Sequence, residues 1–391
     1  MTTQSNIVDI PQARAWPRLL FLPLIGAALV VLPFAIGSDG YLLHVVMSVF
    51  IFATLGQAWN LMAGYAGLLT FGQQAMIGLG GFGMAIIHFY AGMPIWIAWI
   101  GGGVVALAFG WLLCMPLTAR SRSRKTLGVA VAIGAWILYE VVIAMVPAAD
   151  VFGSPFTRRA AILLVIFLGA LPVMKLAGPY FAIATWLTAE SVATLFFSWN
   201  VTGAGSGMQV KTEVSTLTLY YVALGLLSLA TALIYAWMKS DYGLALTAVR
   251  DDPVAAESGG VNVEAIKAMV FIFASGLTGL AAGLYFIDVI VITPASAFTI
   301  NWASIVVFIV VAGGMGTVAG PLLGACLYIL VERLLTQYAD QGMLVLGVLS
   351  ILLMLFLPRG ILGLFSRQGL PQAGASNPLL SLLGNHGKDT K

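Results

Sequence analysis

Apolar stretches of about 20 residues follow one another along most of this chain, and they constrain its fold more than any other feature. Hydrophobic residues make up 60% of the sequence and charged residues only 8%, whereas soluble domains carry roughly a quarter charged residues. A helix of about 20 residues spans the ~30 Å hydrocarbon layer of a bilayer. The apolar runs are continuous rather than alternating, which argues against a β-barrel. We therefore expect an all-α polytopic membrane protein.

The apolar stretches predict about 10 to 12 transmembrane helices within residues 19–358, flanked by polar tails at residues 1–18 and 359–391. The predicted spans are residues 19–36, 41–60, 72–90, 95–117, 127–147, 160–174, 178–198, 217–238, 267–290, 302–313, 317–333 and 343–357. A cytoplasmic N-terminus places most Lys and Arg residues on the cytoplasmic side, as the positive-inside rule expects. Both termini are therefore predicted to be cytoplasmic.

Glycine and polar residues interrupt the span pattern in two places. Residues 60–83 carry Thr70, Gln73 and Gln74 at membrane depth, and residues 312–325 carry Gly314 and Gly316. Irregular backbone inside a bilayer persists only where protein or a water-filled cavity satisfies its amide groups. Both segments are therefore candidates for discontinuous or re-entrant helices that line a translocation pathway. Close helix packing through small residues is the alternative.

The longest polar interruption between spans, residues 239–266, is predicted to be a cytoplasmic loop. Pro253 suits the first turn of a short helix, with a preceding aspartate as its N-cap, and Gly259-Gly260 is expected to end that helix. A short capped helix with both charge signs is suited to a groove on a soluble partner. An ordinary solvated connector is the alternative.

The chain lacks sequence patterns that would let it act alone on nucleotides or as an enzyme. No G-x-x-x-x-G-K-[ST] motif occurs, so the chain cannot bind ATP through a P-loop itself. Its three histidines are scattered without the spacing of metal ligands, and its net charge of +3 gives no reason to expect nucleic acid. Glu190, in mid-span, is a candidate for the transport path. An ion-coupled carrier working through Glu190 or Asp288 is the competing class.

Several motifs then follow one another in order. They are Asn60-Leu61, Gly64-Tyr65, Gly67 and Gly72-Gln73; Gly178-Pro179-Tyr180-Phe181-Ala182 with Glu190; Thr202-Gly203-Ala204-Gly205-Ser206-Gly207; Tyr242-Gly243, Ala248-Val249-Arg250-Asp251, Ala255-Ala256-Glu257, Gly260-Val261-Asn262-Val263 and Lys267; Gly313-Gly314-Met315-Gly316-Thr317 with Gly320-Pro321 and Gly324-Ala325; and Leu357-Pro358-Arg359-Gly360. Together they resemble the LivM-like permease subunits of branched-chain amino acid (LIV-type) ABC importers. One departure is a segment of residues 117–175 that adds a predicted pair of helices.

The resemblance implies an ABC importer permease fold, alternating access and a bacterial inner-membrane location. Two ABC ATPase subunits that bind the ATP, a second LivH-like permease subunit and an extracytoplasmic substrate-binding protein are the implied partners, besides a small-molecule substrate and membrane lipid. No cofactor of its own is expected. The residues implied to couple to the ATPase are Arg250, Asp251, Asp252, Ala255, Ala256, Glu257 and Gly260. The pathway candidates are Thr70, Gln73, Gln74, Tyr180, Glu190, Gly314 and Gly316. Branched-chain or related amino acids are the expected substrates, with urea or an amide as the alternative because urea-transporting relatives share these motifs.

Overall fold

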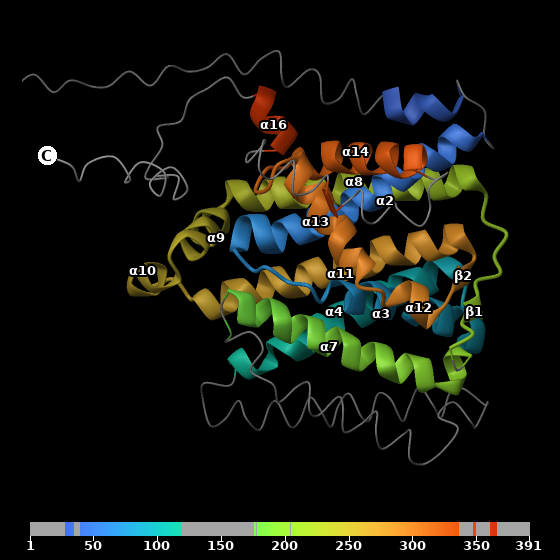
Figure 1. Ribbon diagram of the computed structural model, residues 1–391, viewed down its shortest axis with the longest axis horizontal. Helices are drawn as coiled ribbons and strands as arrows, with labels where there is room; N and C mark the ends of the chain where they lie inside the picture. Colours follow the sequence, from blue (N-terminus) through green and yellow to red (C-terminus); the bar gives the residue numbers. More distant parts are fainter. Residues whose placement is uncertain are drawn as a thin grey trace, which may run out of the picture.

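The computed structural model describes residues 28–34, 40–118, 176, 178–203, 205–335, 347–348 and 360–365. Within these residues, long helices run alongside one another and most of their connections gather at the two ends of the bundle (Figure 1). Seven of the described helices are long and apolar enough to cross a membrane. The all-α polytopic fold is thus confirmed. The predicted total of spans and most of the added segment at residues 117–175 lie outside the described residues.

The first described part contains four of the predicted spans, with ends that agree to within one or two residues. The elements are α2 (Tyr41–Asn60), the π-helical turn η1 (Leu61–Tyr65), α3 (Gln73–Ala91), α4 (Ile95–Thr118) and α7 (Pro179–Ser198). The predicted interruption at residues 60–83 is present, because η1 and the non-helical residues 67–72 separate α2 from α3.

The second part contains a short pair of strands and the remaining helices. The elements are η3 (Asn200–Thr202), β1 (Met208–Gln209), α8 (Thr216–Lys239), α9 (Asp241–Asp251), α10 (Pro253–Ser258), α11 (Val263–Val289), β2 (Val291–Ile292), α12 (Pro294–Ala297), α13 (Asn301–Gly313), α14 (Gly320–Leu335) and α16 (Gly360–Phe365). The strands β1 and β2 pair antiparallel, with Met208 opposite Ile292. The second predicted interruption is also present, because residues 314–319 separate α13 from α14.

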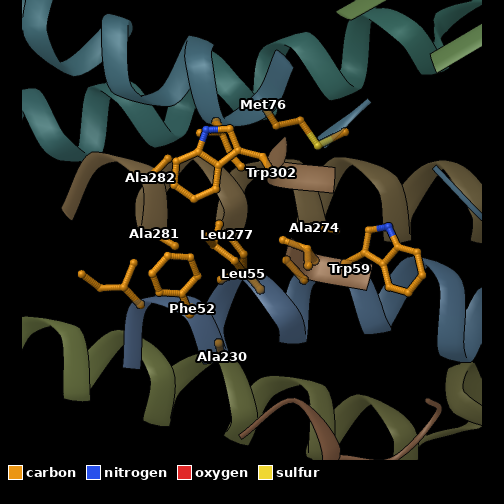
Figure 2. Packing of buried hydrophobic residues seen from close by; sticks show 14 of the residues in the cluster. Phe52, Leu55, Trp59, Met76, Ala230, Ala274, Leu277, Ala281, Ala282 and Trp302 are labelled. Carbon is orange, nitrogen blue, oxygen red and sulfur yellow. The ribbon is translucent and has the colours of Figure 1, made fainter. Parts of the chain in front are cut away.

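The core of the bundle is built around α11, which packs against α2, α3, α4 and α8. Figure 2 shows the central layer, where Ala274 and Leu277 of α11 lie near Leu55 and Trp59 of α2. Small residues let the helices approach closely, since a Cβ added at Gly80 of α3 would collide with the backbone of Gly279. Close packing through small residues is the usual basis of helix association in membranes, and it accounts for Gly80 within the predicted interruption.

The polar segment differs from the predicted single loop. It folds into two helices, α9 and α10, and α11 already begins at Val263, inside the predicted range of residues 239–266. Gly243, Leu246 and Val249 recur every three residues and form the buried face of α9, so the helical periodicity extends beyond the one short helix predicted within this segment.

The predicted short helix α10 is confirmed, together with its end signals. The Asp252 carboxylate accepts hydrogen bonds from the backbone N–H groups of Val254 and Ala255, at 2.9 and 3.1 Å, so Asp252 is the N-cap. Pro253 occupies the first turn, where its missing N–H costs nothing. Gly260 follows the helix with φ +86°, a conformation that favours glycine.

Candidate functional site

The helices α9 and α10 project from one end of the bundle, opposite the end that carries β1 and β2 (Figure 1). Ala256 is the only buried residue of α10. The other six predicted coupling residues, Arg250, Asp251, Asp252, Ala255, Glu257 and Gly260, are all exposed. This placement fits a surface for a partner, with Ala256 serving to hold α10 against the rest of the chain.

Arg250 connects these projecting helices to the interruption after α2. Its Nη1 donates a hydrogen bond to the carbonyl oxygen of Gly64, at 3.2 Å, while its Nε and Nη2 each lie 2.9 Å from Oδ1 of the neighbouring Asp251. Gly67 adopts φ +69°, and a Cβ there would lie 3.3 Å from Cγ of Arg250. The end of α9 is therefore seated directly on the irregular backbone that follows α2.

Asn60 connects the same interruption to the second one. Its Oδ1 accepts a hydrogen bond from the backbone N–H of Gly316, at 2.8 Å, and its Nδ2 donates to the carbonyl oxygen of Thr317, at 2.9 Å. One turn earlier, Nε2 of Gln57 donates to the carbonyl oxygen of Val318, at 2.6 Å. We call Gln57, Asn60, Gly64, Arg250 and residues 314–319 the interruption junction.

Two pathway candidates, Gly314 and Gly316, lie in this junction. Both have positive φ, +126° and +74°, so glycine suits the loop conformation itself. Asn60 enters the sequence predictions only as part of a family motif, and Gln57 does not enter them. The available signal was an amide side chain at the end of a span, immediately before a glycine-containing interruption. Buried amides of this kind require partners.

The candidates Gln73 and Gln74 lie at the start of α3, and both are fully buried. Nε2 of Gln73 donates to Oγ1 of Thr278 on α11, at 2.8 Å, and Nε2 of Gln74 donates to Oε1 of Glu190 on α7, at 3.0 Å. The Oε1 atoms of both glutamines are buried without a hydrogen-bond partner. Such unsatisfied buried acceptors are uncommon in native proteins and are expected at functional or water-binding positions.

Thr70 supports the non-helical segment that precedes α3. Its Oγ1 accepts from the N–H of Gly72, at 3.0 Å, and its carbonyl oxygen accepts from Nε1 of Trp59, at 2.9 Å. The adjoining N–H of Phe71 donates to Oγ1 of Thr185 on α7. Protein groups thus satisfy part of the irregular backbone before α3, as an interruption within a transmembrane segment requires.

Glu190 is exposed on α7, and its Oε1 accepts a second hydrogen bond, from Nε1 of Trp186 at 3.1 Å. Tyr180 is 72% exposed on the first turn of the same helix, about 15 Å along the axis from Glu190 at 1.5 Å per residue. Hydrogen bonds therefore join Gln74 to Glu190, whereas Gly314 and Gly316 belong to the interruption junction. Among the described residues the pathway candidates do not form a single cluster.

The described part of the chain holds no group of three or more His, Cys, Asp or Glu side chains that could bind a metal ion. Its chemistry is that of buried amides, glycine loops and one mid-span carboxylate. Helices long and apolar enough to cross a membrane, two of them interrupted, together with charged helices projecting from one end, indicate a multi-pass membrane protein.

Comparison with known proteins identifies the family. The model of the family described as branched-chain amino acid transport system / permease component matches residues 124–357, more than half of the chain, so the chain belongs to this family. No solved structure matches.

Individual relatives agree with this assignment. The chain is 27% identical over 344 residues to the high-affinity branched-chain amino acid transport system permease protein LivM of Salmonella typhimurium, covering 88% of this chain and 74% of the relative. It is 27% identical over 322 residues to LivM of Escherichia coli, covering 80% and 68%. It is 28% identical over 224 residues to the probable branched-chain amino acid transport permease protein LivH of Methanocaldococcus jannaschii, covering 54% and 67%. The protein is a LivM-like permease.

Proposed function

We propose that this chain is one of two permease subunits of an ATP-driven importer for branched-chain or related amino acids in the bacterial inner membrane. The relatives are named as branched-chain amino acid transport permeases, which supports the substrate class. In this proposal a LivH-like subunit completes the membrane unit, two ATPase subunits bind the cytoplasmic face and an extracytoplasmic protein delivers the amino acid. Both termini of the chain are cytoplasmic in this arrangement.

The observation that carries the proposal is the exposure of α10. A six-residue helix is only marginally stable in water, because helix nucleation is costly and few residues contribute to propagation. The described fold buries only Ala256 of α10 and leaves Val254 75% exposed. A docked partner would cover Val254 and stabilise the helix. Since the sequence has no P-loop, a partner that hydrolyses ATP must supply the nucleotide site.

The interruption junction supports a mechanical role for this contact. A displacement of α9 acts on Gly64 through the Arg250 guanidinium, and α2 is joined to residues 316–318 by Asn60 and Gln57. Closure of the ATPase dimer would therefore move two interrupted helices together. Two helix interruptions that move as a unit are well suited to alternating access, in which one group of helices rocks against another.

The docking assignment is tested by placing the same substitution at opposite ends of the bundle. Glu257→Arg in α10 should greatly reduce the ATPase subunits recovered with the detergent-extracted permease, because it reverses a charge at the contact. Glu213→Arg is the matched control, since Glu213 is an exposed carboxylate between β1 and α8. Val254→Arg should reproduce the loss by burying an unpaired charge.

Full recovery of the ATPase subunits with Glu257→Arg and Val254→Arg, together with uptake as in the unaltered importer, would contradict the proposal. Uptake by the purified chain alone in liposomes, driven by a proton or sodium gradient, would instead favour an ion-coupled carrier.

A further inference from the structure

Glu190 occupies an unusual position for a charged residue in a transmembrane helix. It lies near the middle of the 20-residue helix α7, about 16 Å from the start of the helix at 1.5 Å per residue. It is also the only charged residue of α7. The exposed face of the helix follows helical spacing along residues Tyr180, Ile183, Leu187, Glu190, Thr194 and Phe197. The face is therefore apolar or aromatic at both ends and polar in the middle.

The carboxylate is held in a defined orientation. Its Oε1 accepts hydrogen bonds from Nε2 of the buried Gln74, at 3.0 Å, and from Nε1 of Trp186, at 3.1 Å. Among the described residues, no hydrogen bond reaches Oε2 and no basic side chain pairs with the carboxylate. One oxygen is thus fixed by two hydrogen bonds, and the other has no partner among the residues that the structure describes.

A mid-membrane carboxylate on an exposed helix face is not compatible with lipid on that face. Charged residues within transmembrane segments face protein or a water-filled cavity, and they mark substrate or ion pathways. The two donors on Oε1 are neutral N–H groups, so they orient the carboxylate without neutralising it. Within the described part of the chain, no cationic donor reaches Oε2.

The side chains around Glu190 indicate which kind of molecule would bring a cationic donor to Oε2. The apolar side chains of Ile183, Leu187 and Phe197, which are 51%, 56% and 45% exposed, line the same face above and below the carboxylate. An ammonium group next to an aliphatic side chain matches this combination. The ammonium would form a charge-assisted hydrogen bond with Oε2, while the aliphatic group would contact the apolar residues.

We propose that Glu190 binds the α-ammonium group of the transported amino acid, and that Gln74 and Trp186 are positioning residues for its carboxylate. The inference rests on the proposed function for the identity of the transported molecule, and it adds the recognition chemistry. A proton carried by Glu190, or a basic residue of the partner permease subunit, would give different outcomes in the experiments that follow.

The first experiment measures leucine uptake by the complete importer in proteoliposomes. Glu190→Gln should lower the uptake rate at least about tenfold, since a hydrogen bond to a charged group is worth about that factor or more. Glu190→Asp should retain most of the uptake, because it keeps the charge. Glu213→Gln is the matched control outside the spans and should behave as the unaltered importer.

Subunit recovery is measured in the same samples. Uptake by Glu190→Gln within about twofold of the unaltered rate, less than one charged hydrogen bond provides, would overturn the proposal. Loss of the second permease subunit in Glu190→Gln would also overturn it, because the carboxylate would then be an interface residue.

The second experiment tests whether the Glu190 side chain is negatively charged, and it measures cysteine labelling rates rather than transport. Thr194 lies one turn from Glu190, and its Oγ1 bonds only to the backbone carbonyl oxygen of Glu190, at 2.9 Å. Thr194→Cys, in a Cys326→Ser background because Cys326 is exposed and Cys114 is buried, should react with water-soluble thiosulfonates. The ratio of cationic to anionic reagent rates should fall about tenfold when Glu190→Gln is added, because the carboxylate no longer attracts the cation.

Ligand protection then tests for the ammonium group itself. 3-Methylbutylamine, which keeps the ammonium and lacks the carboxylate, should slow the labelling of Thr194→Cys. 4-Methylpentanoate, which lacks the ammonium, should not. The reverse pattern, an unchanged reagent ratio, or no labelling by water-soluble reagents would each overturn the proposal. Failure of the proposed function is distinguishable, because it would appear as an absence of ATP-dependent uptake in the unaltered importer.

Discussion

Replacing Asn60 with alanine removes two hydrogen bonds that join α2 to the loop between α13 and α14, at 2.8 and 2.9 Å. A buried group left without its partner costs about 1–3 kcal/mol in soluble proteins, whereas hydrogen bonds between transmembrane helices average about 0.6 kcal/mol. Gly316 and Thr317 are partly exposed, so water can partly replace Asn60. We therefore expect a loss of about 2 kcal/mol for the pair, a factor of about 30 in the equilibrium between attached and detached loop.

The assay is the number of amino acid molecules transported per ATP hydrolysed by the importer in proteoliposomes. Asn60→Ala should lower this ratio and leave subunit recovery and ATP hydrolysis largely intact, because the docking helices are unchanged. Thr54→Val is the control, since the Thr54 hydroxyl is buried in α2 and bonds only to the carbonyl oxygen of Phe50 in its own helix. An unaltered ratio in Asn60→Ala, or an equal decrease in Thr54→Val, would refute the role of the junction in coupling.

Two further predictions concern stability. Gly324→Ala should lower the thermal unfolding midpoint in detergent, because the new Cβ would collide with the carbonyl group of Ile309. Overpacking of this kind lowers the free energy of unfolding by about 1–3 kcal/mol. Gly225→Ala, with nothing within 4 Å of the new Cβ, should instead stabilise α8 by up to about 1 kcal/mol, and an equal effect of both would contradict the packing argument. Asp252→Ala should destabilise α10 by about 1 kcal/mol, because it removes the N-cap. The backbone amides of α10 in the isolated permease should then exchange with solvent about fivefold faster. Asp252→Asn, which keeps a capping oxygen, should exchange as the unaltered chain does.

The segment that contains α9 and α10 shows which features of a helix can be predicted from neighbouring residues alone. The Asp252 cap, the Pro253 start and the Gly260 end were predicted correctly, because each depends on the conformational preference of one residue and its immediate neighbours. The helix α9 was not predicted as a separate element, although the spacing of Gly243, Leu246 and Val249 is visible in the sequence; only the structure shows that these positions are the buried ones. The exposure of α10 also required the structure, since sequence alone does not distinguish a seated helix from a projecting one.

The pathway candidates show a similar division. Thr70 lies in the non-helical segment between η1 and α3, as the predicted interruption requires, whereas Gln73 and Gln74 are the first residues of α3; that they line a pathway stays a prediction. Their partners were not predictable. Gln74 and Glu190 are 116 residues apart in the chain, and Asn60 and Gly316 are 256 residues apart.

The sequence by itself determined that the chain spans a membrane, where the long helices of the described residues lie and where two of them are interrupted, because these properties follow from the apolarity and backbone preferences of short segments. Only the tertiary structure decided which faces of the helices meet. In a soluble protein the apolar stripe of a helix marks the core, but in a bilayer the lipid-facing and protein-facing sides are both apolar. The rotation of each helix is therefore set by small residues and a few polar contacts, and these include the Asn60 and Glu190 hydrogen bonds that connect distant parts of the chain.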